Sequence, residues 1–195
     1  MESVDYNLDL FEAMLDEIEG FLLSADIFWP LAKHSNHDSP PYPRLSTGAL
    51  LMTQDEILAQ EAEMNADQKA RHADLQRQWQ GVLNKWRSAL GRKSEREMGM
   101  RLNLWRAYLS DLEEGKVSHF DYNRETRNRV QFTRLRTLST GSSKTLKMEK
   151  TIRALDARLL NLTIASEFIW DSRLRETYPE SEFGFLYRQP RDNGR

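Results

Sequence analysis

A chain of 195 residues with a net charge of −2 and no cysteine is long enough to bury a core, and it excludes disulfides, thiolate metal sites and a cysteine nucleophile. The hydrophobic share of 39% and the charged share of 30% are typical of slender helices with wide solvated faces, and five tryptophans, six tyrosines and eight phenylalanines exclude a disordered chain. The acidic first residues and the lack of a long apolar run predict a cytoplasmic protein that does not enter a membrane.

A first helix is predicted to run as far as Pro30, because one apolar stripe continues at spacings of three and four residues. The stripe consists of Leu8, Phe11, Leu15, Ile18, Leu22, Ala25 and Trp29. The stretch 33–43 has the proline and short polar residues of a surface loop. Helical periodicity resumes at Ser46 or Thr47, or at a capping box that begins with Thr53.

The region 53–114 is built from strong helix formers and contains no proline. Its main apolar residues fall into two stripes: Leu75, Trp79, Val82, Trp86 and Leu90, and then Met98, Leu102, Trp105, Leu109 and Leu112. The sequence leaves open whether 53–114 is one helix or is broken near Gly91. We favour a turn at Gly91 and two antiparallel helices, because Ser94 and Glu97 have the spacing of a second capping box. A weaker break is expected at 65–67.

The glycine at position 115 predicts the end of this region, and Ser118 or Asp121 can cap a further helix through Leu138. The run 139–143 is a flexible connector by composition. A last long helix then carries one apolar face, formed by Met148, Ile152, Leu155, Leu159, Leu162 and Ile169. Beyond Asp171, alternating aromatic residues predict a short extended or irregular segment whose rings dock on the helices; they are Phe183, Phe185 and Tyr187.

These elements predict an all-α protein, an irregular antiparallel helical bundle of about five helices with an aromatic, mostly irregular C-terminal tail. Residues 1–170 are the predicted single helical-bundle domain. Residues 171–195 are the predicted tail docked on the bundle, with the last residues frayed.

The sequence contains no constellation that demands a particular chemistry, and it carries no signature of a known family. His34, His37 and Asp38 include metal-ligand types, but two histidines in a Ser- and Pro-rich loop are usually solvated. The run 141–145 looks like the end of a phosphate-binding loop but lacks the glycine before Lys144 and follows a helix. We therefore predict no catalytic residue, no metal site and no cofactor.

Aromatic side chains offer a second route to a ligand site. Trp79, Trp86 and Trp105 could wall a pocket, because flat rings bind planar or cationic groups. At helical spacing on apolar stripes they are more simply core residues. We therefore predict that Trp86 and Trp105 are both buried.

The charge distribution is the feature that stands above background. Residues 1–33 hold eight carboxylates against one lysine, whereas 124–158 holds ten basic residues against three acidic ones. Four carboxylates follow the apolar stripe of the first helix along one flank: Asp9, Glu12, Asp16 and Glu19. We expect this flank to pack beside one of the helices of 124–158, because opposite charge selects neighbours.

The leading functional prediction is a non-catalytic helical interaction or scaffold protein, with a protein partner or self-association, because broad amphipathic surfaces suit packing better than chemistry. A nucleic-acid-binding module is the first alternative, with Phe120, Tyr122 and Phe132 as stacking residues. Its contacts would be Arg124, Arg127, Arg129, Arg134, Arg136, Lys144 and Lys147. A helical-bundle enzyme or small-ligand binder is the second alternative.

Overall fold

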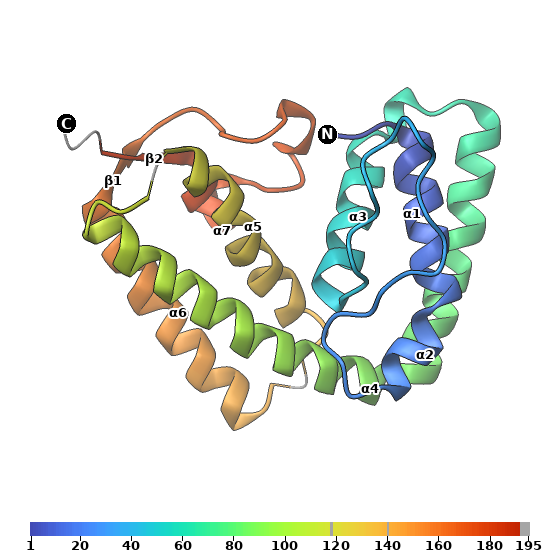
Figure 1. The fold of residues 1–195 in the computed structure, drawn as a ribbon, viewed down its shortest axis with the longest axis horizontal. Helices are drawn as coiled ribbons and strands as arrows, with labels where there is room; N and C mark the ends of the chain where they lie inside the picture. The colour runs from blue at the N-terminus through green and yellow to red at the C-terminus, as the bar shows by residue number, and fades with distance from the viewer. Residues whose placement is uncertain (118, 140, 192–195) are drawn as a thin grey trace. The chain divides into compact units, whose positions relative to one another are not determined.

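The computed structural model describes residues 1–117, 119–139 and 141–191, and these residues are mainly helical (Figure 1). Within them the chain forms seven α-helices, three short 3-10 helices and one sheet of two strands. The all-α prediction is confirmed. The chain divides into two compact units, Met1–Glu97 (unit 1) and Met98–Arg195 (unit 2). The single domain expected over 1–170 stays a prediction, and each unit is described by itself.

Unit 1 begins with α1 (Val4–Asp16) and α2 (Ile18–Leu23), which together carry the predicted apolar stripe. The prediction of one helix up to Pro30 is wrong, because the helix is interrupted at Glu17 and ends at Leu23. Ser24 Oγ accepts a hydrogen bond from the Asp26 amide at 3.1 Å, a local bond that competes with a further helical turn. Trp29 then leaves the helical path and pairs with Leu45 through two backbone hydrogen bonds of 2.8 Å.

Helix α3 (Thr47–Ala59) begins at one of the predicted places. Ser46 is its N-cap and accepts a hydrogen bond from the Ala49 amide at 3.1 Å. The buried carboxylate of Glu97 accepts two more, from the Ser46 hydroxyl at 2.8 Å and from the Gly48 amide at 3.0 Å. A carboxylate at a helix N-terminus is stabilising, because it faces unpaired amides and the positive end of the helix dipole.

Helix α4 (Ala66–Glu113) starts at the expected weak break. Asn65 and Gln68 cap it reciprocally, with bonds of 2.9 and 3.0 Å between each side chain and the other residue's amide. The favoured turn at Gly91 is wrong, since the helix continues through that residue and its kink lies at Trp86 (φ −115°, ψ 18°). The spacing of Ser94 and Glu97 was misleading, because Glu97 caps α3 and not its own helix.

The acidic flank of the first helix is paired inside unit 1. Arg71 of α4 donates to Asp9 at 2.7 Å and to Glu12 at 2.8 Å, and Lys85 binds Glu19 at 2.6 Å. The expected pairing of these carboxylates with 124–158 is therefore wrong. Opposite charge does select a neighbour for the first helix, but the basic residues belong to α4. Helix α4 follows α3 closely in the chain and runs alongside α1 and α2.

Unit 2 contains the end of α4 and two further long helices. Gly115 takes φ 68°, and the amides of Gly115 and Lys116 bond to the carbonyls of Leu112 and Asp111, which closes α4 with a Schellman motif. The other helices are α5 (His119–Arg136) and α6 (Ser143–Leu162). Both end earlier than predicted, and the predicted cap Ser118 lies outside the described residues.

The C-terminal segment of unit 2 is more helical than its aromatic alternation predicts. It contains α7 (Glu180–Phe183) and 3-10 helices over Ser172–Leu174 and Gly184–Tyr187. The short antiparallel strands are β1 (Thr163–Ala165) and β2 (Arg188–Pro190). Successive turns of α7 and the next 3-10 helix bury Phe183, Phe185 and Tyr187 together, so tertiary burial overrides the local strand pattern.

An aromatic cluster forms the core of unit 2. Trp105 is fully buried, stacks on Tyr108 at a centroid distance of 5.6 Å and meets Phe185 at 6.3 Å. The buried Tyr122 hydroxyl of α5 donates to the Phe185 carbonyl at 2.5 Å. Burial in this cluster raises the pKa of Tyr122, so the hydroxyl stays a donor. The cluster therefore ties the C-terminal segment to α4 and α5.

Tryptophan replacements should separate core from surface. Trp105→Ala empties a fully buried site and should lower the free energy of unfolding by about 3 to 5 kcal/mol. Trp86 is half-exposed at the kink, with its indole nitrogen 3.3 Å from Glu19, so the expectation that it is a core residue is wrong. Trp86→Ala should cost only about 1 kcal/mol. Urea unfolding followed by circular dichroism measures both, and equal losses would contradict this assignment.

The buried His72 of α4 should make the protein sensitive to mild acid. Burial lowers the pKa of His72 below its usual 6.5, with an opposing influence from Glu61. Above pH 6.5 the ring is neutral in both folded and unfolded chains, so the free energy of unfolding should decrease as the pH falls below about 6.5. His72→Gln should flatten this dependence in thermal melts between about pH 7.5 and 5. An unchanged slope would show that His72 is not responsible.

Candidate functional site in unit 2

A pocket of about 440 Å³ lies between α5, α6 and the C-terminal segment of unit 2. Its walls combine apolar surface with charged groups of both signs. The lining residues are Arg129, Arg153, Asp156, Ala157, Leu159, Leu160, Glu180, Glu182, Gly184, Phe185 and Arg188. A concave site of this size can hold a large side chain or a small molecule.

A buried arginine forms the inner wall of the pocket. Arg129 of α5 bonds to Asp156 of α6 through Nε at 2.9 Å and through a terminal nitrogen at 2.7 Å. Its guanidinium also lies 4.8 Å from the Phe185 ring centre and donates to the Thr133 hydroxyl. The charge is thus neutralised by a carboxylate and covered by a ring, so Arg129 joins three elements and is not free to bind a ligand.

The remaining charges of the pocket differ in their partners. Arg188 is held by the hydroxyl and the carbonyl of Thr163, at 2.7 and 3.1 Å. Glu182 pairs with Arg136 at 3.2 Å. Arg153 bonds only to a backbone carbonyl of its own helix, and Glu180 has no ion-pair partner among the described residues. Among the described residues, Arg153 and Arg188 of the pocket therefore have no carboxylate partner, and Glu180 has no cation partner.

The outward face of α6 adjoins this pocket. We define it as the exposed residues of α6 from Lys144 onward: Lys144, Leu146, Lys147, Lys150, Arg153, Ala154, Ala157, Leu160 and Asn161. Leu146 is 58% exposed and Leu160 is 52% exposed, whereas the buried side of the helix packs Met148, Ile152 and Leu159. Among the described residues, the cations of this face have no carboxylate partner.

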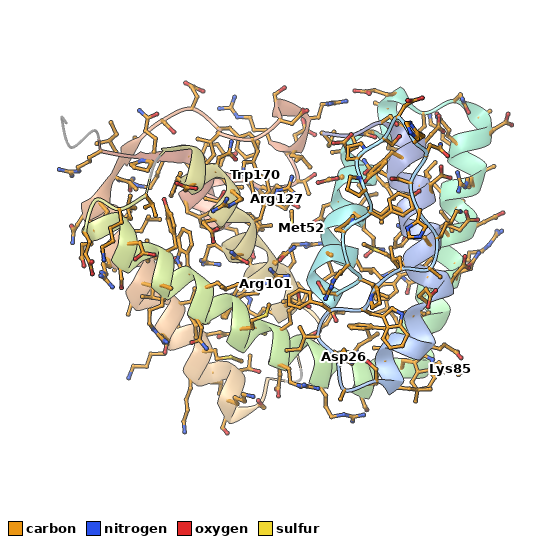
Figure 2. The ribbon with its side chains drawn as sticks, viewed as in Figure 1. Asp26, Met52, Lys85, Arg101, Arg127 and Trp170 are labelled. Carbon is orange, nitrogen blue, oxygen red and sulfur yellow. The ribbon has the colours of Figure 1, made fainter. Side chains whose placement is uncertain are left out.

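The predicted nucleic-acid contacts are mostly occupied by partners within unit 2. Arg124 pairs with Asp121 and Glu125, Arg129 pairs with Asp156, and Arg136 pairs with Glu182. Arg127 lies over the Trp170 ring, 5.8 Å from its centre, and Arg134 is half-buried. Figure 2 labels Arg127 and Trp170 next to each other. Lys144 and Lys147 lie on the outward face of α6. The structure thus does not gather the seven residues into one free basic patch.

Two of the three expected stacking residues are not available at the surface. Tyr122 and Phe132 are both 2% exposed and belong to the core of unit 2, so neither ring can receive a base. The side chain of Phe120 lies outside the described residues. The part of the nucleic-acid hypothesis that uses Tyr122 and Phe132 is therefore wrong.

The other candidates from the sequence occupy structural positions. Ser142 is the N-cap of α6 and accepts from the Thr145 amide at 3.2 Å, so the run 141–145 begins a helix. His34 and His37 are exposed, and the described part of the chain holds no group of three His, Asp or Glu side chains arranged for a metal ion. None of the described helices is long and apolar enough to cross a membrane.

The sequence analysis missed the exposed leucines of α6. Both lie off the apolar stripe of the last helix, and a leucine on the polar side of a clear stripe is a detectable signal. Comparison with family models, curated proteins and solved structures finds no match for this chain. The residues and their geometry therefore carry the functional argument.

The ion pair of Arg129 and Asp156 should be strongly coupled. Arg129→Met leaves Asp156 without its cation and should lower the free energy of unfolding by about 3 to 5 kcal/mol. The double variant Arg129→Met with Asp156→Leu removes both charges and should recover at least about half of that loss. Chemical denaturation of the parent, the two single variants and the double variant measures the coupling free energy between Arg129 and Asp156. Strictly additive losses would show that the pair is not a unit.

Proposed function

We propose that the protein is a non-catalytic interaction protein, and that unit 2 binds an acidic, amphipathic helix of a protein partner on the outward face of α6. One observation carries the proposal: two widely exposed leucines share a helix face with cations that have no carboxylate partner among the described residues. Apolar anchors flanked by one sign of charge are typical of helix recognition. The irregular antiparallel bundle of about five helices expected from the sequence is part of this proposal, as the frame that presents α6.

Charge supports an acidic partner. Residues 144–153 contain four basic residues and one acidic residue, Glu149. Several arginines elsewhere in unit 2 pair with carboxylates; Arg158, for example, binds Glu113 and lowers the pKa of that carboxyl. An uncompensated row of cations attracts an acidic helix and disfavours a basic one, which supplies specificity.

The pocket is a further argument for a protein partner, because it has room for one anchoring side chain of that partner. Leu160 belongs both to the outward face and to the pocket wall, and Leu159 and Phe185 extend the apolar surface inward. Interface side chains that fill such desolvated pockets contribute most of the affinity. A leucine or an aromatic ring from the partner helix would fit beside Phe185.

Two arguments favour binding over catalysis. The lining residues of the pocket include no hydroxyl, imidazole or amine side chain. Two of its three carboxylates, Asp156 and Glu182, are held in ion pairs. A general acid or base needs a free group within reach of a substrate. The proposed setting is the cytoplasm, in line with a chain that has no cysteine.

A labelled helical peptide tests this proposal. The probe has about 20 residues, with leucines at positions i, i+4 and i+7 and glutamates on both flanks. Fluorescence polarisation should show binding to the intact chain, and Leu160→Asp should weaken it at least about tenfold, since a charge replaces the central anchor. Lys147→Glu with Lys150→Glu should weaken it as well and remove its salt dependence.

The chain offers a matched control. Leu23 of unit 1 is 72% exposed, so Leu23→Asp makes the same exchange at an exposed leucine that is not part of α6 and should leave binding unchanged. Equal effects of Leu23→Asp and Leu160→Asp would contradict the proposal. Submicromolar binding of duplex or single-stranded DNA at about 150 mM salt, abolished by Lys144→Glu with Lys147→Glu, would promote the nucleic-acid alternative in its place.

A further inference from the structure

The loop 30–44 of unit 1 contains the proline-rich segment 39–44, with the sequence Ser-Pro-Pro-Tyr-Pro-Arg. The loop is closed at its base by the bridge between Trp29 and Leu45. None of the residues of this segment is fully buried, and the segment has no part in the function proposed for unit 2.

The chemistry of the segment fixes its backbone. Pro40, Pro41 and Pro43 have φ locked near −65° by their rings. Ser39, Pro40 and Tyr42 each precede a proline, which excludes the helical region for these residues and favours extended backbone. The two constraints together select the polyproline II helix, which has three residues per turn and no internal hydrogen bonds.

Exposure along the segment follows the same period of three. Ser39 and Tyr42 are half-buried and Leu45 is fully buried, so every third residue faces unit 1. Tyr42 is anchored by an edge-to-face contact with Tyr6 of α1, at a centroid distance of 5.3 Å. The other two edges of the polyproline helix are exposed and consist of Pro40, Pro41, Pro43 and Arg44.

We propose that residues 39–44 are a preformed ligand for a protein domain of the SH3 type, which reads polyproline helices in an aromatic-lined groove. Pro40 and Pro43 have the P-x-x-P spacing that places two prolines on one edge, the form that such grooves accept. Arg44 is exposed and has no carboxylate partner among the described residues, so it can pair with an acidic groove rim. Because Tyr6 and the Trp29 bridge hold the segment, little conformational entropy is lost on binding.

The inference does not depend on the proposed function of unit 2. Its residues all lie in unit 1, and its partner is a groove and not a helix. If both proposals hold, the chain connects two different proteins, one for each unit.

Titration of the full-length chain into a panel of purified, isotope-labelled SH3 domains tests the inference. At least one domain that binds a reference P-x-x-P peptide should show shifts confined to its aromatic groove. Pro40→Ala with Pro43→Ala should weaken binding at least about tenfold, and Arg44→Glu should weaken it by a similar factor. Pro179→Ala exchanges an exposed proline of unit 2 and should change nothing.

A separate experiment measures how much the preformed conformation of residues 39–44 contributes to binding. Tyr6→Ala leaves the proline edges intact but removes the anchor of Tyr42, so it should weaken binding several-fold. A synthetic peptide of residues 37–46 should bind the same groove more weakly than the intact chain, and this arm does not require any variant to fold. Domains that bind the reference peptide but neither the chain nor the peptide 37–46 would overturn the inference. Binding that persists in the double proline variant would overturn it too.

Discussion

The buried guanidinium of Arg129 is the constraint on which unit 2 depends. A charge in this position is costly unless it is paired, and Asp156 together with the Phe185 ring satisfies it from two other elements. The pairing brings α5, α6 and the C-terminal segment to one point and leaves a pocket beside it. Arg129, whose guanidinium is a common ligand for anions, is thereby part of the framework of unit 2. The residues free to bind a partner lie around it, on the outward face of α6.

Charge is used locally in both units. In unit 1, Arg71 and Lys85 pair with carboxylates on the acidic flank of the first helix, and in unit 2 Arg129 and Arg158 each pair with a carboxylate of another helix. Each exposed pair contributes little to stability, about 0.2 to 1 kcal/mol, so their main effect is to fix which helices are neighbours. The cations without a carboxylate partner among the described residues include a short row on α6 and Arg44 in the proline-rich loop. These two places differ in chemistry, which is why we assign them different partners.

Only part of the candidate site could be predicted from the sequence. The stripe of the last helix identified Met148, Ile152 and Leu159 as buried, and the same helical wheel places Leu146 and Leu160 outside it. Periodicity cannot reveal that Phe185 and Arg129 meet next to Leu160, because they come from segments far apart in the chain. The basic composition of 124–158 likewise says nothing about which arginines already have a carboxylate. Only the pairing of α5 with α6 decides that.

Local patterns alone determined the helical class, the end of the helix at Gly115 and the burial of Trp105, and they gave Ser46 as one possible helix start. These depend on neighbours within a turn or on one face of one helix, so the sequence contains their cause. The tertiary structure alone decided that Glu97 caps α3, that Trp86 lies at a kink and that Trp29 leaves its stripe to pair with Leu45. For Glu97 and Trp29 the deciding partner is distant in sequence and buried, and this outweighs a local preference of about 1 kcal/mol.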